Sequence, residues 1–215
     1  MKIGVFDSGI GGLSMARAIE INIPNVEVLL REDRKNVPYG NKSAAELLKL
    51  VTPILKEMEK SGCEVIVIAC NTVSTAIINE LRAQSSVPLI AMEPMIKPAA
   101  EQTKSGVIAV CATPSTLDSE RYKWLKDKYA ADITVVEPDC SDWAFMIEEE
   151  KVDGFKVAQR LNEALKLGAD VVVLGCTHYH WIEHEIRVLC AGRAKVMQPE
   201  RPVIKQLQRV IEQLS

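Results

Sequence analysis

The stretches VIVIACNT (residues 65–72) and VVVLGCTH (residues 171–178) decide the fold of this chain. Each is a short, continuous run of apolar and mostly β-branched residues that ends in a cysteine and a polar turn. Such runs are typical of strands buried on both faces of a parallel sheet. The two stretches therefore predict an α/β fold in which Cys70 and Cys176 lie at the carboxyl ends of strands.

The rest of the chain alternates in the same way between apolar runs and helical patterns. Strands are predicted at residues 2–6, 26–30, 65–69, 89–91, 107–110, 133–136, 171–174 and 194–197. Helices are predicted at residues 12–19, 43–60, 73–84, 115–129, 154–167, 181–189 and 201–214. This alternation indicates parallel sheets whose two faces are covered by helices.

The pattern of the first half of the chain recurs in the second half. The run IGVF (residues 3–6) resembles VIAV (residues 107–110), and each run leads into a Ser/Thr-rich turn. The two cysteine stretches follow at matching distances. Because both order and spacing are kept, we predict two similar lobes, each a parallel sheet flanked by helices. The boundary is expected near Pro94 and Pro98, which interrupt the pattern.

The composition excludes several classes of protein. The chain has 215 residues, 47% hydrophobic and 26% charged, with a net charge of −3, which is typical of a globular protein and gives no reason to expect nucleic-acid binding. Its six cysteines lack short paired spacings, which indicates reduced thiols in a cytoplasmic protein. No apolar segment approaches the ~18 residues of a membrane span, and the first apolar run is too short for a signal peptide.

The two strand-end cysteines carry the strongest chemical signal. In α/β folds, ligands bind at the carboxyl ends of strands, and a helix N-terminus stabilises a thiolate. Two such thiols in matching positions suggest one on each side of a substrate, as a two-base proton transfer at carbon requires. The alternative is that they are small buried apolar residues, as Cys63 and Cys111 are expected to be.

Two loops are candidate substrate-binding segments. The loop DSGIGG (residues 7–12) has neither the spacing of a dinucleotide loop nor the Gly-Lys-Ser/Thr of a P-loop, so it better suits a small anion such as a carboxylate. Its alternative is a tight strand–helix turn in which Asp7 caps the helix. In the second loop, Tyr39 and Gly40 could present backbone amides, although the capping box of Ser43 and Glu46 favours a structural role.

All three histidines lie within seven residues of one another, at positions 178, 180 and 184. With Cys176 they offer a minor alternative, a metal site, in which His180 and His184 share a helix face at i, i+4 spacing. We instead expect a solvated helix face for those two. His178, beside a strand-end thiol, is expected to be its proton partner.

The run of three glutamates at residues 148–150 is expected to be solvated on its local pattern. The apolar stretch 143–147 that precedes it offers the alternative that Glu148 is turned inward.

Taken together, these motifs resemble those of glutamate racemases, in the cofactor-independent Asp/Glu racemase superfamily. The segments that carry the resemblance are FDSGIGGLS (6–14), PYGNKS (38–43), ACNT (69–72), MEP (92–94), KPA (97–99), Ala112-Thr113 with Thr116, Ser119 and Tyr122, and GCTHY (175–179). The resemblance implies two α/β lobes with the active site in the cleft between them. It also implies interconversion of L- and D-glutamate without cofactor or metal, in the cytoplasm, to supply D-glutamate for peptidoglycan.

The resemblance also assigns roles to particular residues. Cys70 would deprotonate D-glutamate and Cys176 L-glutamate, with Asp7 and His178 assisting them. Glu148 would be a second acidic helper if CSDW (140–143) is a variant of the family's Cys-Pro-x-Phe segment. The implied substrate-binding residues are Asp7, Ser8, Tyr39, Gly40, Asn71, Thr72, Thr113, Thr116, Thr177 and His178. Glutamate is the expected partner, with no nucleic acid and no membrane; a homodimer is left open, because oligomeric state varies among relatives.

Three segments depart from the family pattern. Residues 30–33 (LRED) carry charges where the family has an aromatic and a small residue, and His180 replaces a proline. The C-terminus is short, and residues from about 199 to 215 are expected to join residues 1–93 in the first lobe, with 94–198 forming the second. These departures leave two alternatives open: a racemase of aspartate or another amino acid, and a catalytically weak relative that binds a ligand or partner.

Overall fold

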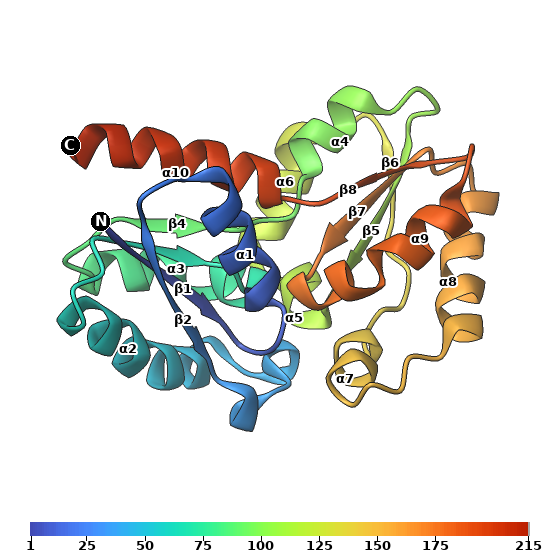
Figure 1. Cartoon of the computed structure of the whole chain (residues 1–215). Coiled ribbons are helices and arrows are strands. Elements are labelled where there is room, and N and C mark those ends of the chain that lie inside the picture. The colour runs from blue at the N-terminus through green and yellow to red at the C-terminus, as the bar shows by residue number, and fades with distance from the viewer. Residues whose placement is uncertain (215) are drawn as a thin grey trace. The chain divides into compact units, whose positions relative to one another are not determined.

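The computed structural model describes residues 1–214 and divides the chain into two compact units (Figure 1). The first unit comprises Met1–Glu93 together with the chain from Glu200 onward, and the second unit is Pro94–Pro199. Each unit contains one four-stranded parallel sheet with helices on its faces. The predicted fold class is therefore confirmed.

The sheet of the first unit has the strand order β2-β1-β3-β4, and every neighbouring pair is parallel. Its strands are β1 (Lys2–Asp7), β2 (Glu27–Glu32), β3 (Val65–Ile68) and β4 (Leu89–Ala91). Its helices are α1 (Gly12–Asn22), α2 (Ala44–Lys60), α3 (Asn71–Gln84) and α10 (Glu200–Leu214), with short 3₁₀ turns at Arg34–Asn36 and Tyr39–Asn41.

Alternate residues of the central strands supply the two cores of this unit. Val65 and Val67 of β3 pack in the core formed with α1 and α10, whereas Ile66 and Ile68 pack in the core formed with α2 and α3. Because side chains alternate across a strand, a continuous apolar run buries both faces of the sheet. The strand at residues 65–69 was predicted because its apolar run is continuous, as burial of both faces requires.

The second unit has the strand order β6-β5-β7-β8, again with every pair parallel. Its strands are β5 (Val107–Ala112), β6 (Thr134–Val136), β7 (Val171–Gly175) and β8 (Lys195–Met197). Its helices are α4 (Ile96–Gln102), α5 (Pro114–Asp118), α6 (Glu120–Tyr129), α7 (Trp143–Glu148), α8 (Gly154–Lys166) and α9 (Glu183–Cys190), with a 3₁₀ segment at Thr177–Ile182.

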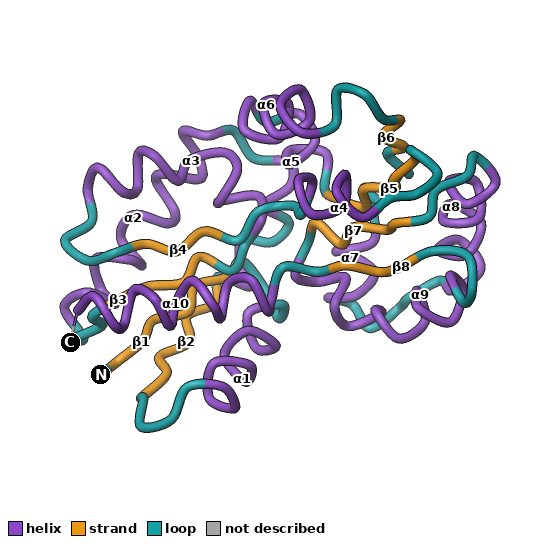
Figure 2. The backbone as a smooth tube through the Cα atoms, turned by 90° about the horizontal axis from the view of Figure 1, so that it is seen from above, coloured by secondary structure: helices purple, strands orange, loops and turns teal. Residues whose placement is uncertain are grey.

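The two sheets repeat the same topology. In each, the first strand of the unit is central and pairs with the second and third strands, and the fourth lies beyond the third. The strands of both sheets are drawn in orange in Figure 2. The predicted internal repeat is confirmed, and it places Cys70 after β3 and Cys176 after the equivalent strand β7.

One predicted helix is divided in the structure, and two helices, α4 and α7, were not predicted. The helix predicted at residues 115–129 is divided into α5 and α6, because Ser119 is extended and its side chain accepts the Tyr122 amide to cap α6. Helix α4 was missed, because Pro98 was interpreted as a break. Pro98 lies in the first turn of α4, where backbone amides have no intrahelical partner, so it is tolerated there.

Helix α10 completes the first unit although it comes from the opposite end of the chain. Its red ribbon runs beside β4 and α1 in Figure 1, and Val203, Ile204 and Leu207 join the core of β1 and β3. We expect Leu207→Ala to lower the free energy of unfolding of this unit by about 2–5 kcal/mol, because Leu207 is fully buried. Urea denaturation measures the loss. Leu214→Ala, at an exposed position of the same helix, is the control and should change stability by less than about 0.5 kcal/mol.

Candidate active site

In the first unit, the carboxyl ends of β1 and β3 bring two site residues together. The strands are hydrogen-bonded neighbours, so the turns that follow them are adjacent. Ser8 follows β1, Cys70 follows β3, and Ser8 Oγ lies 3.4 Å from Cys70 Sγ in a buried hydrogen bond. Cys70 is also the N-cap of α3, so its thiol lies where unpaired backbone amides give a positive partial charge. A thiolate is favoured at such a position.

Asp7 is fully buried at the end of β1, one residue before Ser8. Its expected alternative role as a helix cap is wrong, because the N-cap of α1 is Gly11 and no side chain caps that helix. Gly12 permits the close approach of α1 to Asp7: a Cβ at residue 12 would lie 2.7 Å from Asp7 Cβ and 3.0 Å from Leu30 Cδ1. The loop thus keeps the Asp7 carboxylate in the strand-end cluster rather than in a cap.

Asn71 begins α3 directly after the thiol, and its side chain is 2% exposed. Neither its amide oxygen nor its amide nitrogen has a hydrogen-bond partner among the described residues. Buried polar groups in proteins are nearly always paired, and leaving one unpaired costs about 1–3 kcal/mol. Asn71 therefore has both a donor and an acceptor available for a polar ligand. Thr72, the next residue of α3, is also buried.

The side chain of Tyr39 is held within this unit. Its buried hydroxyl donates to Asp33 Oδ2 at 2.7 Å, and its ring lies 6.5 Å from that of Phe6. Burial and then this hydrogen bond raise the pKa of Tyr39. The Tyr39 hydroxyl is thus occupied, whereas the backbone of the partly exposed Gly40 is more accessible. The capping box of Ser43 and Glu46 is confirmed at the start of α2.

Asp33 was not among the candidate site residues. It is 5% exposed and accepts hydrogen bonds from Tyr39 and from Asn36 Nδ2, which lies 2.8 Å from both of its oxygens. Its backbone amide also donates to the carbonyl of Asp7 at 3.3 Å. In the sequence it appeared as one more charge of the departing segment 30–33. Local pattern contained no signal that Asp33, unlike its neighbour Glu32, is buried.

In the second unit, Cys176, His178 and Glu148 form a hydrogen-bonded chain. Cys176 Sγ lies 3.6 Å from His178 Nδ1, and His178 Nε2 lies 2.7 Å from Glu148 Oε1. The side chains of His178 and Glu148 are only 4% and 11% exposed. An ionised carboxylate can only accept, so it selects the ring form with hydrogen on Nε2 and leaves Nδ1 to accept from the thiol. The arrangement is that of a thiol with a proton acceptor oriented by an acid.

The local interpretation of the glutamate run was wrong for its first member. Glu148 is turned inward at the end of α7, whereas Glu149 and Glu150 are exposed. Trp143, Ala144 and Ile147 bury one face of α7, and Glu148 follows Ile147. Because a helix turns about 100° per residue, the apolar face determines which glutamate points inward.

Three threonines lie at strand ends of the second unit. Thr113 and Thr116, which share a 3.0 Å hydrogen bond between hydroxyl oxygens, follow β5, and Thr177 follows Cys176. All three are buried. Since β5 and β7 are paired, Thr113 and Cys176 occupy the positions in this unit that Ser8 and Cys70 occupy in the first.

The expectation for His180 was also wrong. His180 lies in the 3₁₀ segment rather than on a helix face with His184, and burial lowers its pKa to about 4, so it is neutral at pH 7. His184 is exposed on α9. Within residues 1–214, no three His, Cys, Asp or Glu side chains are grouped so that they could hold a metal ion.

Two further features concern the cysteines and the helices of the described chain. All six cysteines are buried free thiols. Among the helices formed by residues 1–214, none has both the length and the apolar character needed to cross a membrane.

Known proteins of one family are similar to this chain in sequence. The sequence model of the family described as Asp/Glu/Hydantoin racemase matches residues 24–211. A glutamate racemase of Herpetosiphon aurantiacus is 36% identical over 213 residues, covering 97% of this chain and 84% of the relative. One from Pseudomonas aeruginosa is 37% identical over 214 residues, covering 97% and 81%.

Solved structures of glutamate racemases are similar to this chain in fold. The Escherichia coli glutamate racemase, in complex with L-glutamate and the activator UDP-MurNAc-ala, has a TM-score of 0.91 at 26% identity, covering 98% of this chain and 82% of that one. The Francisella tularensis glutamate racemase, in complex with D-glutamate, has a TM-score of 0.80 at 29% identity, covering 99% and 81%.

The fold, with a thiol at equivalent strand ends of two repeated units, and these similarities define an amino-acid racemase, an isomerase. The chain belongs to the Asp/Glu/Hydantoin racemase family.

Proposed function

We propose that this protein interconverts L- and D-glutamate by a cofactor-independent transfer of the α proton between two cysteines. The substrate assignment is supported by the relatives, which are named glutamate racemases, and by the similar structures that hold L- or D-glutamate. As the family resemblance implies, the D-glutamate produced would serve peptidoglycan synthesis. The mechanism is supported by the residues around each thiol.

The observation that carries the proposal is the chain from Cys176 through His178 to Glu148. When L-glutamate is bound, His178 Nδ1 accepts the thiol proton, and the resulting imidazolium is stabilised by the Glu148 carboxylate 2.7 Å from Nε2. The Cys176 thiolate then removes the α proton. In the reverse direction the Cys176 thiol returns a proton to the same face of the carbon atom.

The corresponding base of the first unit is Cys70, with the α3 N-terminus, Ser8 and Asp7 in its surroundings. The backbone amides and the Ser8 hydroxyl stabilise a thiolate or an adjacent carboxylate, and the buried Asp7 carboxylate favours a protonated group, such as the substrate ammonium, beside it. Asn71 offers both its donor and its acceptor to the substrate. We assign Thr72, Tyr39 and Gly40 to substrate binding in this unit, and Thr113, Thr116 and Thr177 in the second.

Inversion requires that the two thiols act on opposite faces of the α carbon. One thiolate takes the proton, the planar carbanion forms, and the other thiol donates its proton from the opposite side. The product is the inverted amino acid. In the enzyme, the cysteine that took the α proton is now a thiol, and the cysteine that donated its proton is now a thiolate. Exclusion of water would strengthen the hydrogen bonds that hold the substrate carboxylates and the developing charge.

The test is exchange of the α hydrogen in D₂O, followed by NMR for both enantiomers of glutamate, with circular dichroism to follow loss of optical activity. Exchange from both enantiomers together with racemisation is the expected result. A folded protein that exchanges neither enantiomer of glutamate but exchanges aspartate would assign a different substrate to the same scaffold. Tight glutamate binding without any exchange would contradict catalysis altogether.

A further inference from the structure

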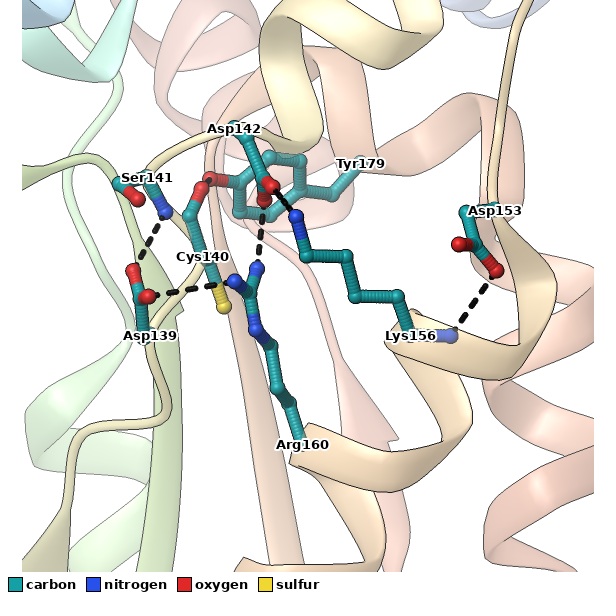
Figure 3. Close-up of polar contacts among 8 residues, drawn as sticks. All are labelled: Asp139, Cys140, Ser141, Asp142, Asp153, Lys156, Arg160 and Tyr179. Carbon is teal, nitrogen blue, oxygen red and sulfur yellow. Dashed lines mark hydrogen bonds and ion pairs between the residues drawn. The ribbon is translucent and has the colours of Figure 1, made fainter.

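We propose that Asp142 and Arg160 are positioning residues for Cys176, which act by holding α7 in the place where Glu148 meets His178. The inference rests on the proposed function, because it assigns to an ion-pair cluster the orientation of the His178 ring that serves the thiol. The cluster, which we call the α7 clamp, consists of Asp139, Asp142, Lys156 and Arg160 (Figure 3).

The α7 clamp joins the loop before α7 to helix α8. Arg160 donates from Nη1 to Asp142 Oδ1 at 2.5 Å and from Nη2 to Asp139 Oδ2 at 3.2 Å, so one guanidinium bridges two carboxylates. Lys156, one turn earlier on α8, donates to the other oxygen of Asp142. Figure 3 shows these side chains converging on Asp142, which is the N-cap residue of α7. The N-cap of α7 is thereby held by two side chains of α8.

The same loop is attached to the segment that carries His178. The hydroxyl of Tyr179, which is fully buried, donates to the carbonyl of Cys140 at 2.9 Å, and the rings of Tyr179 and Trp143 meet edge to face at 5.2 Å. His178, the residue before Tyr179, meets Glu148 at the other end of α7. Helix α7 is therefore fixed to the 3₁₀ segment at both of its ends.

Helix α7 needs such fixing because it has only six residues. A helix of this length is not stable on its own, so its position depends on tertiary contacts. The loop before α7 is also tied within itself, because the Ser141 amide donates to Asp139 Oδ1 at 3.1 Å.

The clamp is charged throughout the neutral pH range. Although partial burial alone would raise it, the pKa of Asp142 is lowered by hydrogen bonds from Lys156 and Arg160. The pKa of Asp139 is lowered by its hydrogen bonds to Ser141. Arg160, whose side chain is 16% exposed, serves both carboxylates, and such a shared network holds geometry better than a single exposed ion pair.

The test measures the pH dependence of Cys176 alkylation by iodoacetamide, with each cysteine peptide quantified by mass spectrometry. The titratable neighbours Tyr179, whose pKa burial raises well above its usual value, and His180, whose pKa is lowered to about 4, keep their charge between pH 6 and 9. The profile in this range therefore reports Cys176 together with the His178–Glu148 pair.

We expect Asp142→Ala and Arg160→Met each to move the half-maximal pH of Cys176 alkylation upward by about half a unit, because a displaced Glu148 no longer stabilises the imidazolium. The profile of Cys70 should not move.

Asp153→Ala is the matched control. Asp153 caps the same helix α8 by accepting the Lys156 amide at 3.1 Å, so its loss destabilises α8 by about 1 kcal/mol without removing the α7 clamp. The proposal is overturned if Asp153→Ala moves the Cys176 profile as much as Asp142→Ala does, or if neither clamp variant moves it. Asp142→Asn, which keeps the side-chain volume, replaces Asp142→Ala if that variant does not fold.

Glu148→Gln separates this proposal from the proposed function. If Glu148→Gln moves the Cys176 profile and the clamp variants do not, only the positioning role of the α7 clamp is wrong. If Glu148→Gln leaves the profile unchanged, the assigned link between Glu148, His178 and the thiol is wrong, and the clamp proposal is overturned with it. Because alkylation does not depend on turnover, either result can be obtained whichever amino acid is the substrate.

Discussion

Cys70→Ser and Cys176→Ser are each expected to lower the rate of glutamate racemisation at least about 10³-fold, or about 4 kcal/mol in the activation barrier. A serine hydroxyl keeps the size and hydrogen-bonding capacity of the thiol, but it ionises far less readily and so does not provide a base at neutral pH. In the proposed mechanism, the thiol that remains in each variant still acts on one side of the α carbon. Loss of optical activity, followed by circular dichroism, measures the effect.

The exchange pattern identifies which thiol faces which enantiomer. In D₂O, the Cys70→Ser variant should exchange the α hydrogen of L-glutamate without inversion, and Cys176→Ser that of D-glutamate. Cys63→Ala, which removes another buried thiol of the first unit, is the control and should racemise glutamate at close to the wild-type rate. Wild-type turnover by both serine variants would contradict the two-thiol mechanism.

Glu148→Gln is expected to lower kcat about 10- to 100-fold while changing KM for L-glutamate by less than about threefold. The neutral amide keeps the volume of the side chain but no longer stabilises an imidazolium at His178, from which Glu148 is separated by 2.7 Å. In the proposed mechanism, the affected step is proton transfer from Cys176 to His178 in the bound complex, so kcat is expected to change more than KM. Steady-state kinetics in the L-to-D direction measures both constants.

Glu149→Gln is the natural control for this substitution. Glu149 is the next residue in the chain, but it is exposed and pairs with Lys151 at 3.4 Å. Its replacement should leave both constants unchanged. Equal losses from Glu148→Gln and Glu149→Gln would show that general charge in this segment, rather than the contact with His178, matters for turnover.

Regular repeating patterns made the architecture readable from the sequence. Each of the eight predicted strands is present with its ends within two residues, because a continuous apolar run can be buried only as a two-faced parallel strand or a buried helix, and these runs are too short for helices. The contact between Ser8 and Cys70 was not predicted, although its physical reason is simple: the strand ends that carry the two residues are adjacent in one sheet.

Contacts between segments that are distant in the sequence could not be predicted from apolar patterns. The inward turn of Glu148, the partial burial of His180 and the hydrogen bond from Tyr39 to Asp33 each depend on which neighbour lies across a helix or loop. The α7 clamp is a further case, because Asp142 and Arg160 are 18 residues apart and nothing in their local pattern distinguishes them from solvated charges.

The sequence by itself thus determined two repeated α/β units, a thiol at the equivalent strand end of each, and the racemase family. These depend on periodic apolar burial and on short motifs whose residues lie next to one another in the chain. Only the tertiary structure decided which charged side chains are buried and paired. The reason is that burial of a charge depends on the partner that compensates its desolvation, and that partner comes from elsewhere in the chain.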